Sequence, residues 1–159
     1  MALTIYFIIA WFIIIIICLL PRKLSFVENS FIFLFLSIVI KNSFTVFGLN
    51  LKWIEANMEP EFFLAYLLYR TIIYPCALLF MVTILYTYRK TVIRVTAILS
   101  VSIFILLVEN LGQWLDVYTY TQWNNWYTII EIAVFSILAI FISKLIIHSS
   151  KRTKNYESI

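Results

Sequence analysis

The sequence predicts an all-α fold: a polytopic membrane helix bundle with five transmembrane helices, its N-terminus outside and its C-terminus cytoplasmic. Composition, the length of the apolar runs and the placement of lysine and arginine predict this class. Of 159 residues, 64% are hydrophobic and 13% are charged, whereas soluble domains are about 45–50% apolar and about 25% charged. The net charge of +4 does not indicate nucleic-acid binding, because the basic residues cluster at the ends of apolar runs.

The first two apolar runs cover residues 3–20 and 31–47. A helix crosses the hydrocarbon core with about 20 apolar residues, and runs this continuous are not barrel strands. We expect the first run to be a retained span, because no basic segment precedes it and no small-residue cleavage site ends it. Lys41 and Asn42 interrupt the second run, so a re-entrant segment is the alternative there.

The last three runs cover residues 62–86, 92–111 and 127–147. In the first of these, Pro75 lacks an amide hydrogen, and we expect it to kink the helix and free a carbonyl group. In the last, Ser136, Ala139 and Ser143 form a small-residue face that suits close helix approach. Each run is long enough to be one transmembrane helix.

Lysine and arginine predict the orientation. Five helices threaded in order place nine basic residues on one side of the membrane and only Lys52 on the other. The nine are Arg22, Lys23, Arg89, Lys90, Arg94, Lys144, Lys151, Arg152 and Lys154. Cytoplasmic loops carry the excess of lysine and arginine, so this side is expected to be the cytoplasm. The transmembrane domain is then residues 1–148, and a basic cytoplasmic tail covers residues 149–159.

Four charged residues lie inside the apolar runs, each on a different helix: Lys41, Arg70, Glu109 and Glu131. With a rise of about 1.5 Å per residue, all four fall in the outer half of the membrane, where Gln113 lies close by. A charge at the bilayer centre costs about 2.5–3.5 kcal/mol, so such residues usually face a partner or a cavity. Because two cations can balance two anions, we expect one outward-facing polar cluster.

Two tyrosines are expected to join this cluster. Tyr66 and Tyr74 lie four residues before and after Arg70, and residues four apart are neighbours on the surface of a helix. Their hydroxyl groups would then lie on the same side of the third span as the guanidinium.

The cluster has three interpretations. In the first, Arg70 pairs with Glu109 or Glu131 only to fix helix packing and register. In the second, an outward-opening pocket holds a ligand, and Arg70 and Lys41 bind its anionic group, because a guanidinium grips carboxylate or phosphate in a bidentate manner. In the third, the charges contact the helices of a partner.

The second outer loop, residues 112–126, is rich in tryptophan, tyrosine and amide side chains. Aromatic rings of this kind favour the interface between headgroups and hydrocarbon. The candidate contact residues of the loop are Trp114, Asp116, Trp123 and Asn124. An anchoring belt is one interpretation of this loop, and a lid over the polar cluster is the other.

No catalytic constellation accompanies the cluster. The chain has one histidine and two glycines, so we expect neither a multi-histidine metal site nor a glycine-rich phosphate loop, and no cofactor. We therefore expect an integral plasma-membrane protein that acts as an accessory or sensing subunit, without enzymatic activity. Its expected partners are the lipid bilayer and another membrane protein or a second copy of the chain.

Two other functions remain open. One is binding or transport of a small anion or a lipid headgroup. The other is a lipid-modifying enzyme that uses Glu109 or Glu131 as its acid or base, since a carboxyl group alone specifies no reaction. An open cavity with an unpaired Arg70 would indicate a ligand, whereas a closed and fully paired cluster would indicate packing.

Four short motifs stand out after the first helix: Phe47-Gly48, Tyr74-Pro75, Glu109-Asn110-Leu111-Gly112 and Tyr120-Thr121-Gln122-Trp123-Asn124. In these motifs the chain resembles a group of small five-helix membrane proteins of unknown function from spore-forming Gram-positive bacteria. The resemblance implies a bacterial plasma-membrane protein in which Glu109 and the Trp-Asn segment recur. It implies no substrate.

Overall fold

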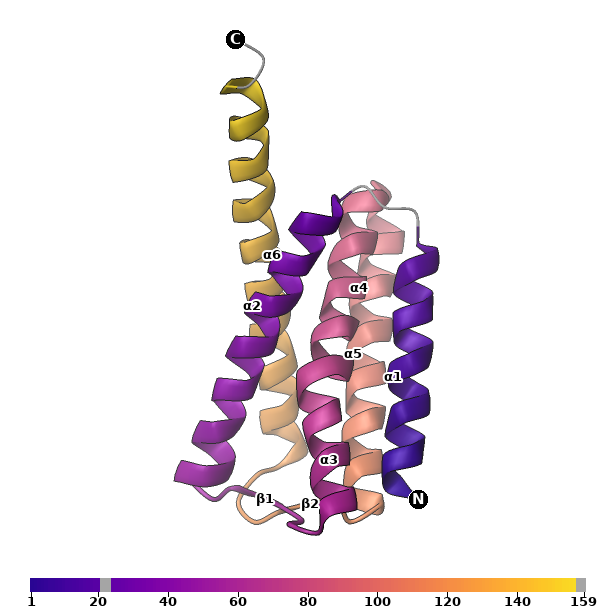
Figure 1. Cartoon of the computed structure of the whole chain (residues 1–159), viewed down its shortest axis with the longest axis vertical. Helices are drawn as coiled ribbons and strands as arrows, with labels where there is room; N and C mark the ends of the chain where they lie inside the picture. Colours follow the sequence, from indigo (N-terminus) through magenta and orange to yellow (C-terminus); the bar gives the residue numbers. More distant parts are fainter. Residues whose placement is uncertain (21–23, 157–159) are drawn as a thin grey trace.

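The helices form a bundle whose axes run alternately up and down (Figure 1). The computed structural model describes residues 1–20 and 24–156, and their side chains as far as residue 149. Within this part, five helices are long and apolar enough to cross a membrane. Met1 and the end of the last helix lie at opposite ends of the bundle (Figure 1). The predicted class, a helical protein with five apolar spans, is confirmed.

The helices and strands have the following bounds. In chain order they are α1 (Ala2–Leu19), α2 (Phe26–Phe44), η1 (Thr45–Asn50), β1 (Ile54–Ala56), α3 (Pro60–Leu68), η2 (Tyr69–Ile73), α4 (Tyr74–Thr87), α5 (Thr91–Trp114), β2 (Tyr118–Tyr120) and α6 (Asn125–Tyr156). The π-helical turns η1 and η2 continue their neighbours, so α2 with η1 is one span and α3, η2 and α4 are another.

The second span begins before its apolar run because a capping box starts it. Ser25 Oγ accepts a hydrogen bond from the Glu28 amide (3.2 Å), and the Glu28 carboxylate accepts one from the Ser25 amide (2.7 Å). The whole span, Phe26–Asn50, has 25 residues and runs the length of the bundle (Figure 1). This favours a full crossing over the re-entrant alternative. Arg22 and Lys23, which support the predicted orientation, lie outside the described residues.

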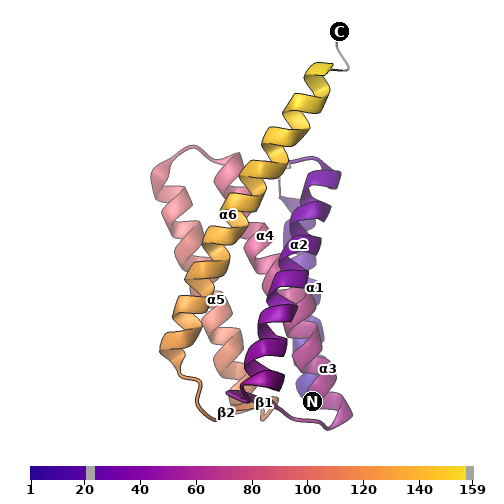
Figure 2. The ribbon, with the colours of Figure 1, turned by 90° about the vertical axis from the view of Figure 1, so that its left-hand side faces the viewer.

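The last helix is longer than its apolar run. α6 continues to Tyr156 and extends beyond the other helices (Figure 1, Figure 2). The predicted tail, residues 149–159, thus begins as helix, while residues 157–159 and the basic side chains of the tail lie outside the described part. The small-residue face is confirmed, because Ser136, Ala139 and Ser143 are all buried.

The third span is the centre of the bundle. In its most apolar window 67% of the residues are buried, against 22–33% in the other four spans. It is also irregular, because η2 inserts a π turn directly before α4 and its Pro75. The proline cannot donate to the carbonyl of Thr71, four residues back. That carbonyl instead accepts a hydrogen bond from Ser37 Oγ on α2 (3.3 Å), as expected for a carbonyl freed by proline.

The two loops predicted to lie outside, called the outer loops, pair with each other, an arrangement that the sequence did not predict. β1 and β2 run antiparallel, with Ile54 opposite Tyr120 and Ala56 opposite Tyr118. The paired loops close the end of the bundle where Met1 lies (Figure 1, Figure 2).

Asp116 determines the direction in which the chain runs from α5 to β2. Its φ of 54° ends α5 in a left-handed turn. The amides of Asp116 and Val117 donate to the carbonyls of Gln113 (3.1 Å) and Gly112 (2.9 Å), which is the hydrogen-bond pattern of a Schellman motif. The chain therefore leaves α5 in the direction of β1.

Candidate functional site

Arg70 is the centre of the candidate site. It lies in the π turn η2, in the central span, and is only 2% exposed. Its Nη2 donates to Glu109 Oε1 on α5 at 2.9 Å, and its Nη1 lies 4.0 Å from Glu131 Oε1 on α6. The structure therefore brings together three of the four predicted intramembrane charges.

Aromatic rings surround the guanidinium. Its Cζ atom lies 2.9 Å from the ring centroid of Phe44 and 4.7 Å from that of Tyr69. The rings of Tyr66, Tyr74 and Tyr118 follow at 5.9–6.0 Å. Ring faces attract a cation electrostatically, and a guanidinium is weakly hydrated, so arginine is the cation best suited to such an environment.

Glu109 accepts hydrogen bonds at both carboxylate oxygens. Oε1 accepts from Arg70 and also from the Tyr120 hydroxyl (2.7 Å), and Oε2 accepts from the Tyr69 hydroxyl (2.7 Å). The Tyr118 hydroxyl donates to the Glu109 main-chain carbonyl at 2.7 Å. Three charge-assisted hydrogen bonds therefore fix this carboxylate in place.

Tyr118 and Tyr120 reach Glu109 because they lie two residues apart on β2, and alternate strand residues project to the same face. Burial, and next the charge of Glu109, raise the pKa of Tyr118 and of Tyr120 above the ordinary phenol value. Both side chains therefore stay neutral and keep the hydrogen that they donate. The loop pair is thus bonded to the buried charges beneath it, which supports the lid interpretation of the outer loop.

Glu131 differs from Glu109, because both of its carboxylate oxygens are buried without a hydrogen-bond partner among the described residues. The only cation within ion-pair distance, in the same part of the chain, is Arg70 at 4.0 Å. Arg70 in turn has two nitrogens, Nε and Nη1, that no described residue engages in a hydrogen bond. One arginine thus serves two carboxylates and hydrogen-bonds only one of them.

Lys41 does not join the buried network, contrary to the predicted balance of two cations with two anions. Its side chain is exposed and makes no ion pair in the part of the chain that the structure describes. The three buried charges alone sum to −1, one cation against two anions. The predicted depth of Lys41 does not determine which way its side chain faces on a largely apolar helix.

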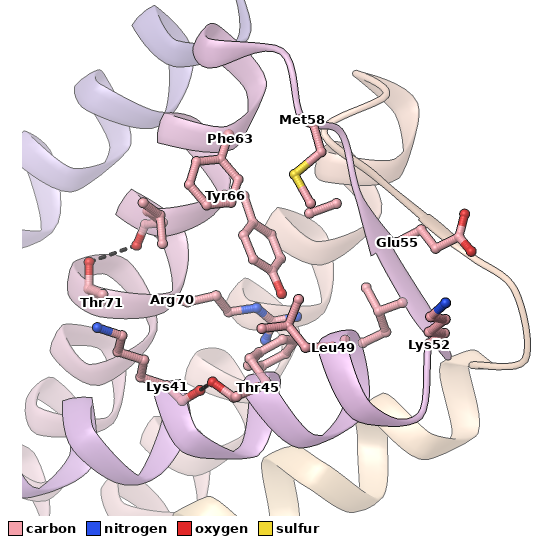
Figure 3. A pocket seen from close by; sticks show the side chains of 15 residues that line it. Lys41, Thr45, Leu49, Lys52, Glu55, Met58, Phe63, Tyr66, Arg70 and Thr71 are labelled. Carbon is pink, nitrogen blue, oxygen red and sulfur yellow. Dashed lines mark hydrogen bonds between the residues drawn. The ribbon is translucent and has the colours of Figure 1, made fainter.

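A cavity of about 580 Å³ lies where Lys41 projects. The second span lines one side, α3 and η2 line the other, and β1 contributes to the end near the paired strands. Its polar and charged lining residues include Lys41, Lys52, Glu55, Tyr66, Arg70 and Thr71. Figure 3 shows the Arg70 guanidinium between Tyr66 and Thr45, within the ring of lining side chains. The buried network therefore meets an open pocket at Arg70.

Two of the candidate outer-loop residues are tryptophans with opposite environments. Trp123 is buried, and its Nε1 donates to Thr128 Oγ1 (2.9 Å). Trp114 is 78% exposed at the end of α5. Trp123 thus belongs to the packed interior, and Trp114 suits the anchoring interpretation.

The amide candidates make no hydrogen bond to the charges in the described structure. Asn124 is exposed, and its carbonyl accepts from the Tyr127 amide at the start of α6. Gln113 is partly buried, but its Nε2 has no hydrogen-bond partner within the described structure and is not bonded to the charges. Neither these amides nor Trp114, Asp116 and Trp123 are among the described residues that line the cavity.

Sequence reasoning missed the hydrogen-bond donors to Glu109. Tyr66 and Tyr74 lie near the guanidinium as expected, but the tyrosine of this span that donates to the carboxylate is Tyr69. Tyr69 directly precedes Arg70 in the chain, and a rule that selects residues four apart does not select an adjacent residue. No local sequence pattern indicates that its hydroxyl meets Glu109.

No family model, curated protein or solved structure matches this chain. Among the described residues, no group of three or more histidine, cysteine, aspartate or glutamate side chains could hold a metal ion. The fold and the site define the class: a bundle of five apolar helices, each long enough to span a membrane, with a buried arginine–glutamate network beside a pocket near the paired strands.

Proposed function

We propose that this protein binds the anionic headgroup of an amphiphile, of the phosphodiester type, in the pocket at Arg70, and that it acts as a membrane sensing subunit without enzymatic activity. One observation supports this most directly. Arg70 lines the pocket and is buried, yet its Nε and Nη1 have no hydrogen-bond partner in the described part of the chain. A buried donor left unpaired costs about 1–3 kcal/mol, and a bound anion would satisfy it.

The charges of the pocket favour an anion. Lys41, Lys52 and Arg70 line it, and Glu55 is the one acid among its described lining residues. A guanidinium offers paired donors to a phosphate, while a lysine ammonium supplies a point charge. Two exposed lysines and one preorganised arginine are a suitable arrangement for such a headgroup.

The apolar part of the pocket favours an amphiphile over a free ion. Leu49 and Met58 line the pocket and are 67% and 72% exposed. Phe63 and Leu67 continue the apolar wall on α3. An acyl chain lying along these side chains would remove their surface from water, at about 25 cal/mol per Å².

The proposal includes the orientation of the protein in the membrane. The excess of lysine and arginine at the opposite end of the bundle supports an outward-facing pocket in a plasma membrane, and the short motifs support a bacterial one. A sensing role needs a second membrane protein or a second copy of the chain to receive the signal. Affinity purification in a mild detergent should recover that partner in stoichiometric amount, and repeated recovery of monomer alone would contradict the sensing role.

The alternative of a lipid-modifying enzyme has less support. Neither Glu109 nor Glu131 is among the described residues that line the pocket, and Glu109 is engaged by three donors. A general acid or base must lie within hydrogen-bond reach of the reacting proton. Glu55, the acid that does line the pocket, is exposed on β1, where water would compete with any substrate for its carboxylate.

Thermal stabilisation in detergent tests the binding proposal, because a ligand that binds only the folded state raises the melting temperature. Short-chain phosphatidylglycerol should stabilise the protein more than short-chain phosphatidylcholine, whose headgroup carries no net charge. Lys41→Gln should remove most of this difference. Lys144→Gln, which removes an exposed lysine from α6, outside the pocket, is the matched control and should retain it.

Two results would count against the proposal. Equal stabilisation by both lipids would show no preference for the anion, and an unchanged response of Lys41→Gln would place the binding elsewhere. The deacylated headgroup, glycerophosphoglycerol, distinguishes the two sources of the phosphodiester. Equal stabilisation by it would identify a soluble ligand in place of a lipid.

A further inference from the structure

We propose that anion binding at Arg70 is coupled to protonation of Glu131, so that the pocket takes up one proton together with its ligand. This inference rests on the proposed function and adds a regulatory property to the same site. It concerns Glu131, which faces the arginine but is not among the described residues that line the pocket.

The nitrogens of Arg70 differ in what they contact. Nη2 is engaged with Glu109 at 2.9 Å. Nη1 lies 4.0 Å from Glu131, too far for a hydrogen bond, and Nε has no partner among the residues described. An anion in the pocket would bind the unpartnered nitrogens, and it would therefore compete with Glu131 and not with Glu109.

Charge counting gives the direction of the coupling. With Glu131 ionised, Arg70, Glu109 and Glu131 sum to −1, and a singly charged ligand would bring the buried total to −2. Uptake of one proton from water onto the Glu131 carboxylate returns the total to −1. Burial of uncompensated charge is costly, so ligand and proton favour each other's binding.

The proton goes to Glu131 because its oxygens are free to accept it. Both oxygens of Glu109 already accept hydrogen bonds, from Tyr69, Arg70 and Tyr120. Both Glu131 oxygens are buried, and no described residue donates to them. A protonated Glu131 is neutral and no longer attracts the guanidinium. The Nε and Nη1 nitrogens of Arg70 are then available to the ligand.

Ionisable groups from each packed element face this carboxyl. They are Arg70 from η2, Glu109 from α5, Tyr66 from α3 and Tyr74 from α4, whose hydroxyl has no hydrogen-bond partner within residues 1–20 and 24–149. On α2, which also packs against α6, the ionisable residue nearest the site is Lys41, in the pocket. Of these groups, only Arg70 lies within ion-pair distance of Glu131 and also lines the pocket.

The test measures affinity for short-chain phosphatidylglycerol against pH in detergent. Its phosphodiester keeps a single negative charge from mildly acidic to mildly alkaline buffer, so ligand titration does not interfere. Wild-type affinity should rise as the pH falls, by at least about five-fold, the lower end of typical coupling between linked sites. Proton uptake on binding, measured with an indicator dye in weak buffer, should accompany it.

Two variants locate the effect. Glu131→Gln mimics the protonated state and should bind with high affinity at every pH and take up no proton. Glu55→Gln removes an exposed carboxylate that lines the pocket and, as the matched control, should keep the pH dependence. Persistence of the pH dependence in Glu131→Gln, or its loss in Glu55→Gln, would overturn the assignment.

The wild-type protein alone decides the remaining cases. Binding that is equally tight at every pH, without proton uptake, would overturn the coupling and leave the proposed function intact. An absence of binding at any pH would overturn both. Because proton uptake is measured on the wild-type protein, the inference stays testable even where Glu131→Gln does not fold.

Discussion

Tyr120 and Arg70 bind the same oxygen atom, although one belongs to an outer loop and the other to the central span. The Tyr120 hydroxyl and the Arg70 Nη2 both donate to Glu109 Oε1, at 2.7 and 2.9 Å. The outer loop is therefore bonded directly to the intramembrane charges. This relationship makes the loop part of the site, so changes in the loop should affect the whole bundle.

Loss of the Tyr120 hydroxyl should destabilise the protein. Hydrogen bonds to charged groups contribute about 1.5–3 kcal/mol, so Tyr120→Phe should lower the free energy of unfolding by about that amount. Unfolding in a series of detergent mixtures with increasing dodecyl sulfate measures it. Tyr127→Phe is the control: Tyr127 is 44% exposed and its hydroxyl makes no hydrogen bond in the described structure. Equal effects of both variants would contradict the role of the Tyr120 hydroxyl.

Gly112 should not tolerate a side chain. A Cβ atom there would lie 2.6 Å from both Tyr118 Cε1 and the Tyr6 hydroxyl, and overpacking typically costs about 1–3 kcal/mol. Gly112→Ala should therefore lower the melting temperature. At Gly48 the nearest atom to an added Cβ is 3.5 Å away, so Gly48→Ala should change it much less. A reversed order of the two variants would contradict the packing of Tyr118 over Gly112.

Asp116 should matter through its backbone and not through its charge. Its φ of 54° is a left-handed conformation that costs most residues about 1–2 kcal/mol, with Gly exempt and Asn or Asp better tolerated. Asp116→Gly should preserve stability, whereas Asp116→Val should lose about that amount, measured by the same unfolding assay. A loss in Asp116→Gly as large as that in Asp116→Val would indicate that the carboxylate itself contributes.

Alkaline pH should destabilise the paired outer loops. The pKa values of Tyr118 and Tyr120 are raised in the folded protein, while the unfolded chain ionises at the ordinary phenol value, 10.0. Their contribution to stability is therefore complete below that pH and is lost as the pH rises above it. Unfolding measured across this range should show the decline, and Tyr120→Phe should make it shallower. An identical slope in the variant would show that Tyr120 ionises as freely in the fold as in the unfolded chain.

The bundle could be predicted from the sequence because membrane spans depend on local composition. Each of the five apolar runs corresponds to one of the five spans, and Arg70, Glu109 and Glu131 meet as their predicted depths imply. The direction in which the Lys41 side chain points could not be predicted in the same way, because it depends on how the helices pack.

The donor Tyr120 could not be predicted either. It reaches Glu109 from β2, whose position depends on β1, where Ile54 is its partner. The whole of α3, η2, α4 and α5 separates these two strands in the chain. The register of such a short and distant pair is not encoded in the local pattern of either loop.

The π turn in the third span has a consequence for how the two halves of that helix are related. One residue more than an α-helix would hold rotates everything beyond it by about 100°, since a turn takes 3.6 residues. α3 and α4 therefore differ in rotational phase although they are joined without a loop. The turn η2 directs Arg70 toward the carboxylates, while α4 presents mainly apolar side chains to its neighbours. A single inserted residue thus separates the polar layer of the bundle from its apolar layer.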